Sequence, residues 1–245
     1  MKRIWLAGAC CVEILVACPA AAQQYTISPD YPQSLRRDLE ALRALGAHNS
    51  SNPALLVRLA ELHRHLADDL LQNPEARRAS YEEGARIARR ALEIQETNAE
   101  AHYLYAVNLG SVARMQGPFQ GLGSLGEIKT HLARAIELDP DHAPALGFMG
   151  GLLAELPSFL GGDEAAAQRY LERAIAVDRN YTSARIVLAR LLIEKNQVEA
   201  AKQQLRAVIE AEHPRYPYTW RRTFRPEAEE LLRALGSGQR SERRP

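Results

Sequence analysis

Hydrophobic residues recur every three or four positions along most of the chain, which is the spacing of one buried face of an α-helix. Runs of β-branched residues are missing, whereas Ala, Leu, Arg and Glu, which favour helix, are abundant. The sequence therefore predicts an all-α protein. The expected helices span residues 33–45, 53–71, 78–95, 99–115, 127–138, 143–156, 163–177, 182–195, 197–210 and 226–235.

Several of these helices end in a similar sequence pattern of small and aliphatic residues, which indicates an internal repeat. The pattern begins at Ala91, Ala135, Ala174 and Ala207. Residues 135–140 match the end of a tetratricopeptide repeat, in which the small Ala lets two helices approach and Asp-Pro ends the second one. The intervals exceed the usual length of about 34 residues where Gly- and Pro-rich segments, residues 116–123 and 156–162, are inserted. We expect a tetratricopeptide-like helical-repeat superhelix with long insertions between paired helices.

The predicted organisation has four parts. Residues 1–22 resemble a signal peptide, because Lys2 and Arg3 precede an apolar stretch too short to span a bilayer comfortably. Cleavage before Cys18, with lipidation of that residue, and cleavage after Ala22 both fit the sequence. Residues 23–50 contain a leader helix, residues 51–211 four helix pairs, and residues 212–245 a capping helix and a disordered basic tail. The leader predicts a periplasmic or extracytoplasmic protein, membrane-anchored if Cys18 is lipidated.

Two stretches carry a family resemblance. Residues 54–71 lead into Tyr81-Glu82, and residues 150–163 are followed by the pattern Ala167-x-x-Tyr170-Leu171-x-x-Ala174. Together they resemble the tetratricopeptide T-component associated with tripartite ATP-independent periplasmic (TRAP) transporters. This resemblance implies a helical-repeat protein, often a lipoprotein, that engages a periplasmic solute-binding protein.

Charge and motif spacing argue against several other classes. The net charge of +1 gives phosphate groups no concentrated basic surface, so nucleic acid is not an expected partner. Residues 121–126 match G-x-G-x-x-G, but no strand precedes them as a dinucleotide site requires. His63 and His65 lie two residues apart, which points their side chains to different sides of a helix. We therefore expect no catalytic residue, no cofactor and no metal.

The expected binding surface is the concave side, which the first helix of each pair lines. By register it contains Tyr103, Val107, Gly110, Gly147, Gly151, Ala154, Ile186, Arg190 and Ile193. The insertions add Phe119, Leu122 and Phe159. Such a groove suits a segment of a partner protein or a small hydrophobic ligand. The alternative is that these side chains only pack against neighbouring helices.

Function follows from this geometry. We expect a non-enzymatic extracytoplasmic protein that binds a partner or a hydrophobic ligand, as the T-component resemblance implies. The alternatives are a general periplasmic scaffold for envelope assembly or secretion and, less favoured, a nucleotide- or metal-dependent enzyme. The sequence leaves the identity of the ligand and homo-oligomerisation open.

Overall fold

The computed structural model describes residues 30–117 and 121–242, and every regular element within these ranges is helical. This confirms the predicted all-α fold. None of the described helices is both long and apolar enough to cross a membrane. The predicted signal peptide with Cys18, and Phe119 in the first insertion, lie outside the described residues.

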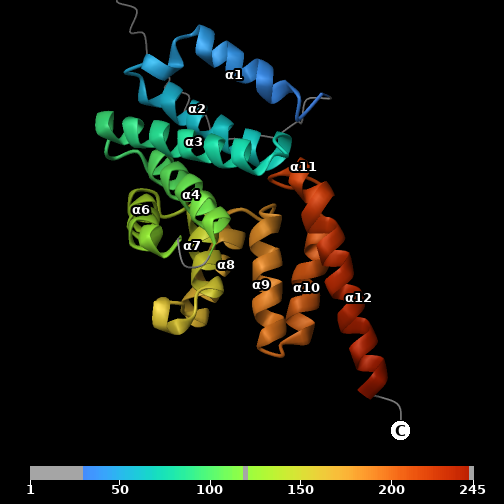
Figure 1. Cartoon of the computed structure of the whole chain (residues 1–245). Helices are drawn as coiled ribbons and strands as arrows, with labels where there is room; N and C mark the ends of the chain where they lie inside the picture. Colours follow the sequence, from blue (N-terminus) through green and yellow to red (C-terminus); the bar gives the residue numbers. More distant parts are fainter. Residues whose placement is uncertain (1–29, 118–120, 243–245) are drawn as a thin grey trace, which may run out of the picture.

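The described helices form four pairs with additional elements at both ends (Figure 1). α1 (Ser34–Ala44) and the short η1 (Ala47–Asn49) precede the pairs. The pairs are α2 (Pro53–His65) with α3 (Pro74–Ile94), α4 (Ala99–Gln116) with α6 (Leu125–Leu138), α7 (Ala143–Glu155) with α8 (Glu164–Val177), and α9 (Thr182–Glu194) with α10 (Val198–Ile209). One π-helical turn, η2 (Leu66–Leu70), extends α2. The chain continues with α11 (Pro217–Thr219), η5 (Trp220–Phe224) and α12 (Arg225–Glu242).

Side-chain caps begin many of these helices. Asn52, Asn73, Asn98 and His142 precede α2, α3, α4 and α7, and each accepts a hydrogen bond from a backbone N–H of the first turn. Asp163 does the same for α8. Ser124 and Glu127 have the spacing of a capping box, which predicts mutual hydrogen bonds at the start of α6. The structure contradicts this prediction, because Ser124 makes no side-chain cap and Glu127 accepts a hydrogen bond from Tyr105.

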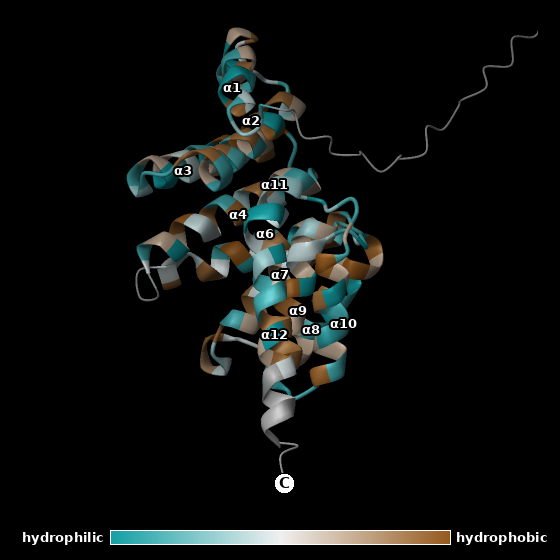
Figure 2. Cartoon of the chain, turned by 90° about the vertical axis from the view of Figure 1, so that its right-hand side faces the viewer, coloured by the Kyte–Doolittle hydropathy of each residue, from teal (hydrophilic) through white to brown (hydrophobic). Residues whose placement is uncertain are grey.

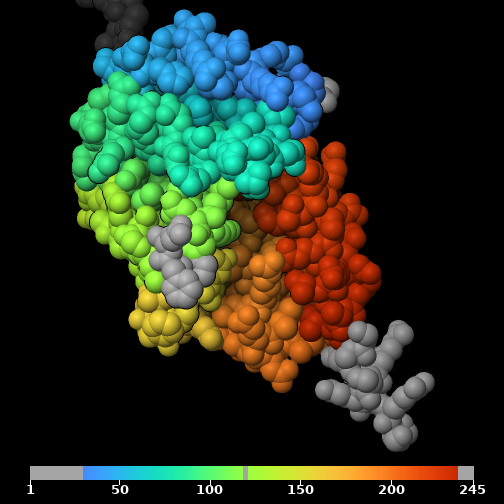
Figure 3. Space-filling model, in the orientation of Figure 1, coloured from blue at the N-terminus to red at the C-terminus, as the bar shows by residue number. Residues whose placement is uncertain are grey.

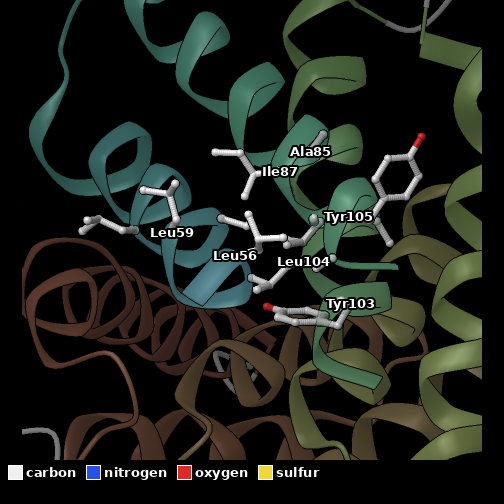
Figure 4. Close-up of a cluster of buried hydrophobic side chains, with 14 of the residues drawn as sticks. Leu56, Leu59, Ala85, Ile87, Tyr103, Leu104 and Tyr105 are labelled. Atoms are coloured by element: carbon white, nitrogen blue, oxygen red, sulfur yellow. The ribbon is translucent and has the colours of Figure 1, made fainter. Parts of the chain in front are cut away.

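The repeat residues form the contacts between paired helices. Ala91, Ala135, Ala174 and Val208 are fully buried, as expected where two helices approach closely. Hydrophobic and hydrophilic positions alternate along the helices (Figure 2), and the hydrophobic ones meet between neighbours. Figure 4 shows Leu56 of α2 close to Leu104 of α4 in the largest cluster. Neighbouring first helices therefore lie side by side: α2 contacts α4, α4 contacts α7, and α7 contacts α9.

The two insertions make tight local turns. The first continues into η3 (Leu122–Ser124), and the second contains η4 (Ser158–Leu160). A Cβ atom at Gly162 would overlap the carbonyl oxygen of Leu156, so only glycine fits this turn. Lys129 of α6 donates to the carbonyl oxygen of Gly161 at 2.9 Å, which holds the second insertion against the second helix pair.

The C-terminal segment packs on both ends of the array. α12 lies along α10, and the indole N–H of Trp220 donates to the carbonyl of Val208 at 2.7 Å. Thr219 reaches back to the first pair, where its hydroxyl donates to Asp69 at 3.1 Å. α12 continues to Glu242, whereas the sequence pattern predicted that the last helix ends at Leu235 and that a basic tail follows it.

Candidate binding cavity

The first helices of the four pairs surround one cavity of about 340 Å³, which we call the concave cavity. α2 and η2 border it on one side, α4 and α7 form its middle, and α9 borders it on the other side. Tyr216, Thr219, Phe224 and Glu227 of the C-terminal segment complete the wall. Figure 3 shows a recess where the surfaces of the first pair (teal), α4 (green), α9 (orange) and the C-terminal segment (red) meet.

Six of the nine concave-surface residues predicted from helical register line this cavity: Tyr103, Val107, Gly147, Gly151, Ile186 and Arg190. Gly110, Ala154 and Ile193 do not line it. Tyr103 and Ile186 are almost fully buried, whereas the side chain of Arg190 is more than half exposed. The insertion residues differ: Leu122 and Phe159 are exposed and do not line the cavity. Their role in binding stays a prediction.

Two of these positions are glycines, and the space beside each is used differently. A Cβ atom at Gly147 would lie 2.5 Å from Cε1 of Tyr181, so the buried tyrosine ring occupies that space. A Cβ atom at Gly151, one helical turn further along α7, would meet nothing within 4 Å. The cavity is therefore open above Gly151 and filled by protein above Gly147.

A polar cluster at the first helix pair was not predicted from the sequence. Arg64 is buried, and its guanidinium donates to Asp68 at 2.8 Å and lies over the ring of Tyr216 at 5.4 Å from the centroid. Its Nε atom has no hydrogen-bond partner among the described residues. A buried cation is stabilised only when it is paired and hydrogen-bonded, so the cluster makes one end of the cavity polar. The groove expected from the sequence, suited to a partner segment or a hydrophobic ligand, did not include such a polar end.

Asp69 connects this cluster to the C-terminal segment. It is buried and accepts hydrogen bonds from the hydroxyl groups of Tyr31 and Thr219. Burial alone would raise the pKa of Asp69, but the interaction with His65, whose Nδ1 lies 3.7 Å from Asp69 Oδ2, and the hydrogen bond from Tyr31 outweigh burial and lower that pKa. Asp69 therefore stays ionised and holds α11 beside the first pair.

Ion pairs stand at the rim of the cavity. Arg190 Nη2 lies 2.5 Å from Glu227 Oε1, and this pair joins α9 to α12. Arg114 Nη2 lies 3.5 Å from Glu155 Oε2, which joins α4 to the end of α7. All four residues line the cavity, so its entrance presents both charges beside an apolar floor.

Comparison with known proteins identifies the family. The model of the family described as "Regulator of microtubule dynamics protein 1-3" matches residues 29–153, more than half of the chain. This chain belongs to that family. A second model, for the tetratricopeptide repeat, matches residues 159–219.

Curated relatives and a solved structure agree with this assignment. Regulator of microtubule dynamics protein 1 from Bos taurus is 29% identical over 203 residues, which are 76% of this chain and 63% of that protein. The Mus musculus protein is 29% identical over 154 residues, 57% of this chain and 50% of the relative. The chain thus spans less than two thirds of the length of these relatives. The crystal structure of a thermophilic tetratricopeptide protein from Thermus thermophilus matches this chain with a TM-score of 0.50 and 20% sequence identity. The match covers 82% of this chain and 98% of that one. This likeness concerns the fold alone.

These findings confirm one part of the sequence-based interpretation and correct another. The tetratricopeptide repeat is confirmed. The predicted periplasmic or extracytoplasmic location is wrong, because the matching family and the curated relatives, from Bos taurus and Mus musculus, are named regulators of microtubule dynamics. The T-component resemblance receives no support from the matched families.

Proposed function

We propose that this regulator of microtubule dynamics family member is a non-enzymatic scaffold whose concave cavity binds a short segment of a partner protein. One observation carries the proposal: the first helices of all four pairs and the C-terminal segment contribute side chains to a single cavity. Residues from distant parts of the chain thereby converge on one bound segment, as in other grooves that recognise peptides.

The size and charge of the cavity define the kind of segment. A volume of about 340 Å³ is at the low end for ligand pockets and accommodates a few side chains rather than a whole helix. Leu152 and Val187, which line the cavity and are partly exposed, offer apolar contacts. Gly151 exposes backbone, and the ion pairs at the rim offer both charges. We propose a segment with an apolar side chain at its centre and charged residues on either side.

The names of the relatives extend the proposal to a cellular process. Those proteins are named regulators of microtubule dynamics, and we propose that the partner of this chain belongs to the same process. Because the chain spans only part of the relatives' length, this extension rests on the shared family region. We do not extend the proposal to a transporter or to secretion, which the comparisons do not favour.

Peptide display followed by affinity measurement tests the cavity. Peptides are selected on the wild-type protein, and their binding to Gly151→Leu is measured by fluorescence anisotropy. A leucine at Gly151 projects into open space within the cavity, so we expect at least a tenfold loss of affinity. Gly126→Leu is the matched control, because Gly126 also lies on a helix with nothing within 4 Å of its Cβ position but does not line the cavity. Equal binding to both variants would contradict the proposal.

A further inference from the structure

Three potential metal ligands meet at the N-terminal end of the array, away from the concave cavity. His48 lies on η1, His63 on α2 and Glu83 on α3. One ligand atom from each residue lies within 4.8 Å of the other two. No metal was expected from the sequence, because histidine spacing was compared along single helices, whereas this cluster brings together three separate elements.

The hydrogen bonds of His63 leave one ring nitrogen available. The hydroxyl of Ser80 donates to the carbonyl oxygen of His63 at 2.8 Å, and Ser80 Oγ also lies 3.3 Å from His63 Nδ1. Because the single hydroxyl proton is used by the carbonyl, Nδ1 must be the protonated nitrogen that donates to Ser80. Nε2 then carries a lone pair, and this buried atom has no hydrogen-bond partner among the described residues.

This arrangement is the one that metal-binding histidines generally show. Their second ring N–H is held by a neighbouring oxygen, which fixes the tautomer and the orientation of the ring. In this protein Ser80 provides that oxygen, and His63 is only 6% exposed and so is fixed by its surroundings. Burying a nitrogen lone pair without a hydrogen-bond donor or a metal ion beside it costs free energy.

His48 and Glu83 supply the other ligands from the solvent side. His48 Nε2 lies 3.7 Å from Glu83 Oε1, and both side chains are 29% exposed, so an ion can enter between them. Bonds of about 2.1 Å in a tetrahedral site place ligand atoms about 3.4 Å apart, so the cluster contracts by roughly 1 Å on binding. Arg86 Nη2 contacts Glu83 Oε1 at 2.6 Å and Arg86 Nε donates to Oε2 at 2.8 Å. An ion bound to Oε1 would displace only the exposed Nη2 contact and leave the bond to Oε2 in place.

We propose that His48, His63 and Glu83 form a binding site for Zn²⁺, with water in the fourth position. Two imidazoles and one carboxylate are a donor set that suits zinc, and Ca²⁺ or Mg²⁺ would require more oxygen ligands. The ion connects η1 to both helices of the first pair. Its consequence is to fix the entry of the chain into the repeat array, independently of what the concave cavity binds.

Calorimetric titration of the metal-stripped full chain with ZnCl₂ tests the site. Cys10, Cys11 and Cys18 are changed to Ser in every sample, because thiolates bind zinc tightly. We expect a single zinc ion per chain. Its affinity should fall at least tenfold in His48→Ala and in Glu83→Gln, and about 10–100-fold in Ser80→Ala, which removes the partner of the ligating His63.

Two control variants show whether the histidines named are the ligands. His213→Ala removes an exposed histidine far along the chain, and His131→Ala removes a second histidine pair, in which the Nδ1 atoms of His102 and His131 lie 2.9 Å apart. Both should bind zinc like the parent, and circular dichroism should show all variants folded. The proposal is overturned if the parent binds no zinc, if His48→Ala and Glu83→Gln bind as well as the parent, or if His131→Ala abolishes binding.

Discussion

Gly147 and the ring of Tyr181 share one space between α7 and α9. A methyl group at Gly147 would lie 2.5 Å from Tyr181 Cε1 and 3.1 Å from its hydroxyl oxygen. Tyr181 is buried and immediately precedes α9, so its ring sets how closely the third and fourth pairs approach. The contact therefore determines the shape of the middle of the concave cavity, which both residues line.

Gly147→Ala should destabilise the protein by about 1–3 kcal/mol, the usual cost of overpacking a well-filled interior. The matched control is Gly151→Ala on the same face of the same helix. That variant meets nothing within 4 Å and should be more stable by about 0.5–1 kcal/mol because alanine favours helix. Urea unfolding of both variants checks the prediction. Equal stabilities would mean that Tyr181 moves freely.

Thr219→Val should loosen the C-terminal segment from the first pair. The substitution keeps the shape of the side chain but removes the hydroxyl that donates to the buried Asp69, at a cost of about 1–2 kcal/mol. Amide hydrogen exchange of residues 216–224 should become faster, while exchange in α3 and α8 stays unchanged. A uniform acceleration throughout the protein would instead indicate global destabilisation.

The His102–His131 pair should make stability depend on pH. Burial lowers the pKa of His131, and the neighbouring His102 lowers it further. The unfolded chain therefore binds a proton at His131 more readily than the folded chain does. The contribution of His131 to the free energy of unfolding is fully present above the ordinary histidine pKa of about 6.5, and it is lost as the pH falls through the lower pKa of the folded protein. Urea unfolding at pH 7.5 and 5.5 should show a loss of stability at the lower pH. His131→Asn, which does not titrate, should show a smaller loss.

Leu104→Ala should destabilise the protein by about 2–5 kcal/mol, because Leu104 is fully buried in the cluster between α2, α3 and α4 and its truncation leaves a cavity. Leu45→Ala is the matched control, since Leu45 is 69% exposed; it should change the free energy of unfolding by less than about 0.5 kcal/mol. Thermal and urea unfolding measure both. A small effect at Leu104 would mean that the neighbouring helices close over the space.

Local patterns explain what could be predicted. Ala91 and Ala135 were recognisable as helix contacts because small residues recur at the same place in each repeat, and both are fully buried. Tyr103 and Ile186 were placed on the concave side by helical register alone, and both line the cavity. Register is a property of a few consecutive turns, so the sequence expresses it directly.

Contacts between distant residues explain what was missed. Ser124 and Glu127 have the spacing of a capping box, yet the Glu127 carboxylate accepts a hydrogen bond from the hydroxyl of Tyr105 on α4. This bond between helices replaces the local bond that the spacing predicts. Arg64 drew no prediction from the sequence, because its burial depends on contacts with distant residues such as Tyr216, whose ring lies under the guanidinium.

The amino-acid sequence by itself determined the helical class, the repeat and the side of the superhelix that is concave, because each follows from periodicities of a few residues. Only the tertiary structure decided that the C-terminal segment closes the concave cavity and that His48, His63 and Glu83 meet. The physical reason is that packing and hydrogen bonding between helices far apart in the chain, such as the bond from Thr219 to Asp69, depend on the angles at which whole repeats stack.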